Sequence, residues 1–310
     1  MKAEKLFVVA GFVVITVIWG STWLAIKIGL ESVPPFFGVA LRFTVAGVAL
    51  LIIALARGVS FAHHKENLIL YLSLGFLSFG IPYELVYWGE VRIPSGLASI
   101  LFAFYPFVVA IFSHLFLRNE RLNAYKISGI ILGITGIIVI FWSDLRFEQA
   151  SLGGMVAILL STFLQGISLI IVKRLGKHVD PLTMNCGGIW AGIPLMYLLA
   201  FAFEDVHSVH FDRQGLLSML YLAIVGTVIA FGVFYWLLKR VEAVYLALSS
   251  LVTPILAVIL GTVLLNEQLS PNVFWGASMV LAGIGVTNGK DLSRKFVSAY
   301  SPKTRSNNSR

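Results

Sequence analysis

Three charged side chains interrupt apolar stretches of the sequence: Lys27, Arg42 and Glu84. A charge inside a membrane costs at least about 2.5–3.5 kcal/mol on insertion scales, so such a residue usually has a function. Arg42 and Glu84 are predicted at similar depths in two neighbouring spans, and we expect them to be coupled. A structural ion pair and a substrate or proton site both remain open. Lys27 has a simpler interpretation, which is snorkelling with an ion pair to Glu31, four residues later.

Aromatic and hydroxyl side chains at helical spacing form a second set of candidates for contact with a solute. The set consists of Trp19, Thr22, Trp23, Tyr87, Trp88 and Tyr105. Trp and Tyr near the ends of spans are usually interfacial anchors, but Trp19 is predicted close to mid-span, where that role is weak. An aromatic wall there would favour flat, apolar or cationic solutes.

Two prolines are candidate hinges, because proline frees a backbone carbonyl inside a helix. They are Pro106 and Pro254, and each also has the simpler interpretation of a kink that shapes the bundle. Ser250 and Thr253 precede Pro254 and complete the predicted solute path from the other half of the chain. No metal-ligating group, phosphate-binding loop or catalytic triad is indicated, so the chain is predicted to be no enzyme and to need no cofactor.

The composition identifies the elements that must position these residues. Hydrophobic residues make up 58% of the 310 residues and charged residues 12%, with a mean hydropathy of +0.89. A soluble or disordered chain would carry far more charge, so the chain is predicted to be an all-α membrane protein. The net charge of +8 is explained by basic loops that set topology rather than by nucleic acid.

Ten apolar runs are long enough to cross a membrane. They are Leu6–Leu30, Pro35–Ala56, Asn67–Gly89, Pro94–Leu117, Asn123–Trp142, Leu152–Val172, Leu182–Phe203, Gly215–Leu238, Ala243–Leu265 and Val273–Asn288. Of the 23 Lys and Arg residues, 18 then fall on one side, three on the other and two inside spans. This bias predicts that both termini are cytoplasmic.

The two halves of the chain repeat one another. Lys27 recurs as Lys173 at an offset of 146, and Glu120 recurs as Glu267 at an offset of 147. Because each copy has five spans, the second copy is inverted in the membrane, an architecture typical of secondary transporters. A glycine face at Gly129 recurs at Gly276 and predicts close helix packing. Packing within one protomer is favoured over a dimer interface.

These motifs resemble the EamA domain of the drug/metabolite transporter superfamily. The motifs that carry the resemblance are Trp19-Gly20-Ser21-Thr22-Trp23, Gly96-Leu97-Ala98, Asn119-Glu120-Arg121-Leu122 and Asn266-Glu267-Gln268-Leu269. The resemblance implies two EamA-like repeats, 7–142 and 152–288, with four helices of each around a central cavity and the fifth to one side. Arg42 departs from the duplication, because the second copy has Gly188 at that position.

We therefore predict a secondary transporter, chiefly an exporter, of small organic metabolites such as amino acids, working by alternating access. The predicted partners are a small-molecule substrate and the bilayer, and no nucleic acid. Proton coupling is a candidate, and the protein is predicted to be a monomer or a homodimer. The predicted location is a prokaryotic inner membrane, with a basic cytoplasmic tail at 290–310. The alternatives are an intramembrane lipid-modifying enzyme, which should show a cluster of acid and imidazole groups, and a non-transporting scaffold.

Overall fold

The computed structural model describes residues 2–61, 64–117, 120, 122–144, 149–205, 207, 209–238 and 249–300, and it places no strand among them. The helices are α1 (Lys2–Gly29), α2 (Pro35–Ala56), α3 (Lys65–Leu74), η1 (Gly75–Gly80), α4 (Ile81–Glu90), α5 (Ser95–Phe102), α6 (Tyr105–Phe116), α7 (Ala124–Asp144), α8 (Gln149–Leu175), η2 (Gly176–His178), α9 (Pro181–Phe203), α10 (Arg213–Leu220), η4 (Tyr221–Ile229), α11 (Ala230–Leu238), α13 (Ser249–Leu265) and α14 (Pro271–Tyr300).

The helices confirm the predicted all-α membrane fold with ten spans. In the described part of the chain, eight helical segments are long and apolar enough to cross a membrane, and two shorter apolar helices cover Leu251–Leu265 and Pro271–Thr287. The start of the predicted ninth span, 243–248, lies outside the described residues. Large apolar side chains such as Leu198, Phe203 and Trp275 are exposed, as expected for a surface that faces lipid.

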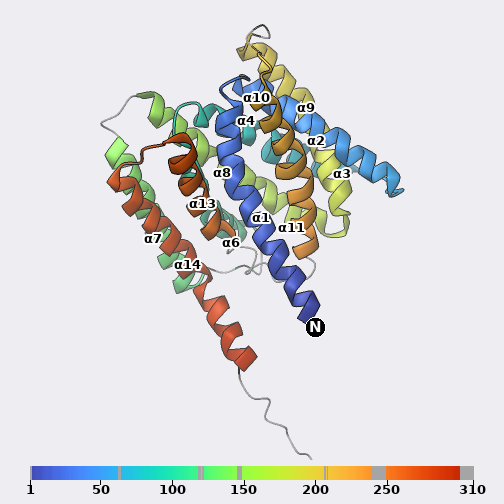
Figure 1. Ribbon diagram of the computed structural model, residues 1–310. Coiled ribbons are helices and arrows are strands. Elements are labelled where there is room, and N and C mark those ends of the chain that lie inside the picture. The colour runs from blue at the N-terminus through green and yellow to red at the C-terminus, as the bar shows by residue number, and fades with distance from the viewer. Residues whose placement is uncertain are drawn as a thin grey trace, which may run out of the picture.

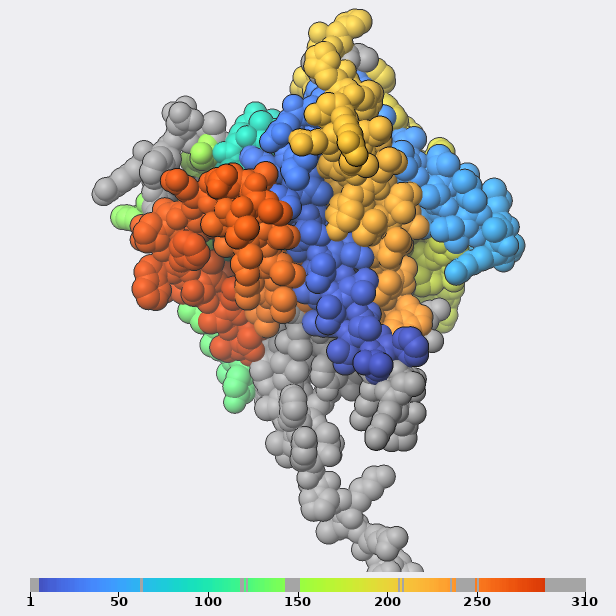
Figure 2. Space-filling view, viewed as in Figure 1, coloured from blue at the N-terminus to red at the C-terminus, as the bar shows by residue number. Residues whose placement is uncertain are grey.

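The bundle is built from helix pairs that join the first repeat to the second. Helix α1 contacts α13, α10 and α11, while α2 contacts α9, α4 contacts α8, and α5 contacts α13. In Figure 1, α1 runs upward from the N-terminus through the middle of the bundle. Figure 2 shows it on the surface between the C-terminal helices in orange and α10 and α11 in yellow. We call the end of the bundle where α1 ends and α2 begins the α1–α2 end.

Two spans contain π-helical segments at corresponding places in the two repeats. Segment η1 lies between α3 and α4, and η4 lies between α10 and α11. They begin at Gly75 and Tyr221, an offset of 146, which is also the offset between Lys27 and Lys173. Pro82 follows η1 and lacks an N–H for the regular helical ladder. Such segments are rare in proteins and occur frequently at functional sites.

The fifth helices of the two repeats, α7 and α14, pack chiefly against each other and lie along one side of the bundle (Figure 1). Glycines allow their backbones to meet, since a Cβ built on Gly136 would lie 2.5 Å from the Gly276 carbonyl oxygen. The predicted glycine face therefore packs within the protomer.

Candidate functional site

Arg42 lies at a junction of three spans and both repeats. Its side chain is 2% exposed. Nε and Nη2 each donate to the Thr227 hydroxyl of η4 at 3.3 Å, and Nη1 donates to the Tyr87 hydroxyl of α4 at 3.2 Å. The guanidinium carbon also lies 5.0 Å from the centre of the Tyr83 ring, within reach of a cation–π contact. The acceptors of this charge are neutral, and we call this group of residues the Arg42 network.

The predicted pair of Arg42 and Glu84 is wrong. Glu84 is 2% exposed, and both of its carboxyl oxygens lack a hydrogen-bond partner among the described residues. The charged group that acts on it is Glu204, at the end of α9. Tyr87, almost one turn further along α4, takes the place beside Arg42. Equal depth in the membrane did not imply contact.

Lys27 also differs from its predicted role. Its Nζ donates to the backbone carbonyls of Glu90 and Ile93, the second at 3.0 Å, rather than to Glu31, which is exposed. The Glu90 side chain beside it is fully buried, and its two carboxyl oxygens have no hydrogen-bond partner among the described residues. Glu90 was not among the predicted site residues, because the third span was predicted to end at Gly89.

Glu267, from the repeated Asn-Glu-x-Leu motif, caps a helix of the other repeat. Its carboxylate accepts hydrogen bonds from the Ser95 N–H at 2.7 Å, the Ser95 hydroxyl at 3.0 Å and the Gly96 N–H at 3.1 Å. These donors form the start of α5, where unpaired N–H groups and the helix dipole favour an anion. Its counterpart Glu120 makes an exposed ion pair with Lys173 at 3.3 Å.

Two further acidic residues cap helices at the α1–α2 end. Glu204 accepts hydrogen bonds from the N–H groups of Phe36 and Phe37 at the start of α2, both at 2.9 Å. Burial raises the pKa of Glu204, although these two donors oppose the shift. Asp212 caps α10, and the Ser32 hydroxyl and the Gly215 N–H hold its pKa below the ordinary value. With Glu267, these carboxylates join the repeats at one end.

The aromatic candidates lie in several different environments. Trp19 is half-buried against Phe231 and Phe234, with ring centres 6.0 and 5.5 Å away, and Trp23 is buried against Phe102 at 5.4 Å. Thr22 bonds the Trp19 carbonyl at 2.8 Å. Of these candidates, only Tyr87 meets Arg42. Two others are placed elsewhere, with the Trp88 ring 3.5 Å from the Arg92 guanidinium carbon and the Tyr105 ring stacked on Phe102.

Helices α1 and α13, which carry candidate residues from the two repeats, pack directly against each other. A Cβ built on Gly20 would lie 2.8 Å from Leu256 and 3.4 Å from the Thr253 carbonyl oxygen. The Thr253 hydroxyl bonds within its own helix, to the Ser249 carbonyl at 2.8 Å. The Ser250 side chain lies outside the part of the structure that can be described.

The two candidate hinges differ. Pro106 is the second residue of α6, directly after the interruption of span 4 at Ala103–Phe104, whereas Pro254 lies inside continuous α13. Only the first proline therefore lies next to a break in its helix.

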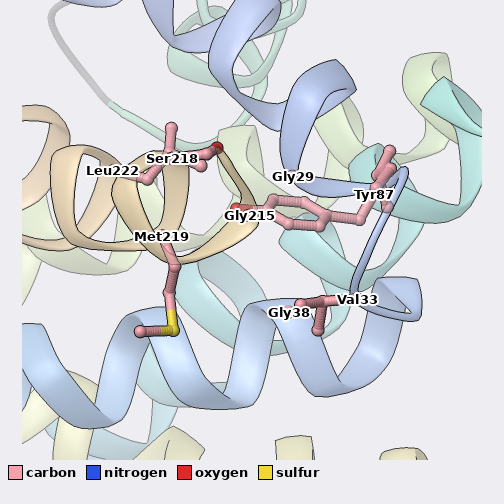
Figure 3. Close-up of a pocket in the computed structure, with 9 residues that line it drawn as sticks. Gly29, Val33, Gly38, Tyr87, Gly215, Ser218, Met219 and Leu222 are labelled. Atoms are coloured by element: carbon pink, nitrogen blue, oxygen red, sulfur yellow. The ribbon is translucent and has the colours of Figure 1, made fainter. Parts of the chain in front are cut away.

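A small cavity opens near the Arg42 network at the α1–α2 end (Figure 3). It has a volume of about 20 Å³, and its lining includes Gly29, Tyr87, Gly215 and Ser218. Figure 3 shows the Tyr87 ring reaching toward Gly215, at the start of α10. Such a volume holds about one water molecule, so this cavity is too small for an organic solute.

Most of the chain is similar to proteins that are named as transporters. Residues 6–142 and 152–289 each match the model of the EamA-like transporter family. An uncharacterized transporter of Bacillus subtilis is 30% identical over 89% of this chain and 95% of its own length. A probable amino-acid metabolite efflux pump of Escherichia coli is 28% identical over 87% and 91%. A solved crystal structure that covers 94% of this chain and 99% of its own has a TM-score of 0.67 at 22% identity, which supports the fold.

Proposed function

Because the chain belongs to the EamA-like transporter family, we propose that it exports small organic metabolites that carry a carboxylate, such as amino acids and related compounds. Export would occur by alternating access, with the five-helix units 7–142 and 152–288 as the bodies that rearrange. We place the protein in a prokaryotic inner membrane with both termini in the cytoplasm. The α1–α2 end then faces outward.

The observation that carries the substrate class is the Arg42 network. A guanidinium has five N–H donors, and the hydrogen bonds among the described residues use three of them, all on neutral hydroxyls. No carboxylate lies within ion-pair distance of Arg42 in the described part of the chain. A buried cation between two repeats is costly unless it is used, and a guanidinium binds a carboxylate in two-point geometry.

The relatives agree with this substrate class. Two of them, from Escherichia coli and Salmonella typhimurium, are named as probable amino-acid metabolite efflux pumps. Amino acids and their derivatives carry the carboxylate that Arg42 would bind. Thr22 of the first span lies near η4, since a Cβ on Gly226 would lie 2.9 Å from the Thr22 methyl group, and Trp19 lies against Phe231 and Phe234 of α11. Thr22 and Trp19 are the proposed wall for the rest of the solute.

The proposal is tested by transport in proteoliposomes. Purified protein is reconstituted, and efflux of amino acids, nucleobases and cationic drugs is measured with and without a proton gradient. We expect transport of carboxylate-bearing solutes by the natural protein and loss of it in Arg42→Met. Arg57→Met is the matched control, because Arg57 is an exposed arginine just after α2.

Two results would contradict the proposal. The first is equal transport of acidic solutes by the Arg42→Met variant, and the second is transport limited to solutes that have no carboxylate. A protein that moves no solute but changes a lipid would favour the alternative of an intramembrane enzyme.

A further inference from the structure

Glu90 is a buried acid that the proposed solute path does not use. Its carboxyl group is fully buried at the end of α4 and has no hydrogen-bond partner among the described residues. The charged groups that face it are Lys27 from α1, Arg42 from α2 and Glu267 from the segment after α13, together with Tyr87 on its own helix. A buried carboxylate without a donor is costly, so the neutral acid fits this site.

The nearest cation does not neutralise Glu90 through its side chain. Lys27 Nζ donates instead to the carbonyl of Glu90 and to that of Ile93. Glu90 ends α4 and Ile93 lies in the short link to α5, two to six residues before Ser95 and Gly96, which donate to Glu267. Lys27, this link and Glu267 therefore join α1, the start of α5 and the end of α13. We call the three the latch.

We propose that Glu90 is a proton-binding site that controls the latch. When Glu90 is protonated, Lys27 stays on the two carbonyls and the α1–α2 end remains closed. When the proton leaves, the new carboxylate competes for the Lys27 ammonium and repels Glu267. The two carbonyls lose their donor, α5 loses its support against α13, and this end opens.

Glu84 provides a contrast on the same helix. It is also buried and also without a hydrogen-bond partner among the described residues. The charge that acts on it is the carboxyl of Glu204 rather than a cation of the latch. Glu90 and Glu84 are thus two buried acids of the same span, and only a change of charge on Glu90 is expected to move Lys27.

The inference rests on the proposed function for its physiological meaning. In an exporter, a proton bound from outside would close the outer end and be released inside. The solute would be carried outward in the other half of the cycle. The opening of the latch itself needs no solute, so it can be measured separately from transport.

The test measures how external pH changes access to α5. Ser99 is 2% exposed and its hydroxyl has no hydrogen-bond partner among the described residues, so Ser99→Cys is conservative. The background is Cys186→Ala, because Cys186 is a buried free thiol. Right-side-out vesicles are treated with a membrane-impermeant methanethiosulfonate reagent over a pH series. Because the thiolate is the reacting form of cysteine, each labelling rate is divided by the rate of a free thiol with the same reagent at the same pH. We expect this corrected labelling rate, used in all comparisons below, to rise with pH by up to about tenfold per unit, because one proton controls the equilibrium.

Variants decide whether Glu90 is the group responsible. Glu90→Gln should give slow labelling that does not respond to pH, whereas the matched control Glu84→Gln should keep the response. Lys27→Met should give fast labelling at every pH, because the latch then lacks its donor. If Glu90→Gln does not fold, Glu90→Asp keeps a titratable group and must keep the pH response.

Several outcomes would overturn the assignment. They are labelling without pH dependence in the parent protein, a response that survives Glu90→Gln, and a response that is lost in Glu84→Gln instead. Loss of transport in Arg42→Met with normal pH-dependent labelling would leave the latch intact and concern only the proposed substrate. Conversely, normal transport with pH-independent labelling would reject the latch alone.

Discussion

Replacing Glu267 by Ala should destabilise the protein more than replacing its repeat counterpart Glu120. Glu267 accepts three hydrogen bonds, at 2.7, 3.0 and 3.1 Å, from Ser95 and Gly96 at the start of α5. Loss of an N-terminal cap costs about 0.5–2 kcal/mol, and loss of a negative charge from the helix dipole costs about 0.3–1 kcal/mol more. We therefore expect the free energy of unfolding to fall by about 1–3 kcal/mol.

The control has the same residue type in the same repeated motif. Glu120 makes an ion pair with Lys173 in which the two side chains are 42% and 37% exposed, and such pairs contribute about 0–1 kcal/mol. Equilibrium unfolding in mixed micelles would measure both variants. Glu267→Gln should fall between them, because its amide oxygen still accepts from one N–H but the charge is lost. If Glu120→Ala lowers the free energy of unfolding as much as Glu267→Ala does, the reasoning is refuted.

Three further predictions concern single contacts. Thr227→Val should lower the free energy of unfolding by about 1–3 kcal/mol, because Arg42 loses the acceptor of two hydrogen bonds; an unchanged denaturation midpoint would contradict this. The pKa of Asp212 is lowered in the folded protein, so its ionised form stabilises the fold at pH values above the ordinary pKa of aspartate. This contribution is lost as pH falls through the folded-state pKa. Asp212→Asn should therefore flatten the acid side of a plot of melting temperature against pH, and an acid side equal to that of the natural protein would count against it. Gly276→Ala should destabilise the packing of α7 on α14, whereas Gly285→Ala, with no atom within 4 Å of the new Cβ, should not; comparable melting temperatures would exclude a backbone contact at Gly276.

The sequence predicts the helices of this fold well, because hydropathy and length decide which segments cross a membrane. It also predicts the inverted repeat and close packing at the glycine face within the protomer, since repeat offsets and glycine spacing can be seen in the sequence; that α7 and α14 are the partners follows from the structure. The depth of Arg42 suggested a polar partner in span 3, and Tyr87 is one of the candidates named there. Thr227 was not foreseen, because its hydroxyl meets Arg42 only through packing between the repeats.

The acidic residues show why the rest could not be predicted. Glu84 and Arg42 were paired because they lie at similar depths, but depth does not give the direction in which a side chain faces. Glu90 lies one residue beyond the predicted end of its span, where an acid is usually solvated. Glu267 was visible as a repeated motif residue, yet its role as a cap depends on the position of α5, which lies 172 residues earlier in the chain.

The number of residues in each π-helical segment sets how the second part of its span is rotated relative to the first. Each residue of a helix adds about 100° of rotation and 1.5 Å of length. Deleting one residue from η1 would therefore shorten span 3 only slightly, but it would swing α4 around its axis and carry Tyr87 away from Arg42. The same holds for η4 and Thr227. Gain or loss of a single residue in either segment thus changes which side chains meet at the centre of the bundle, while the number of spans and the topology stay the same.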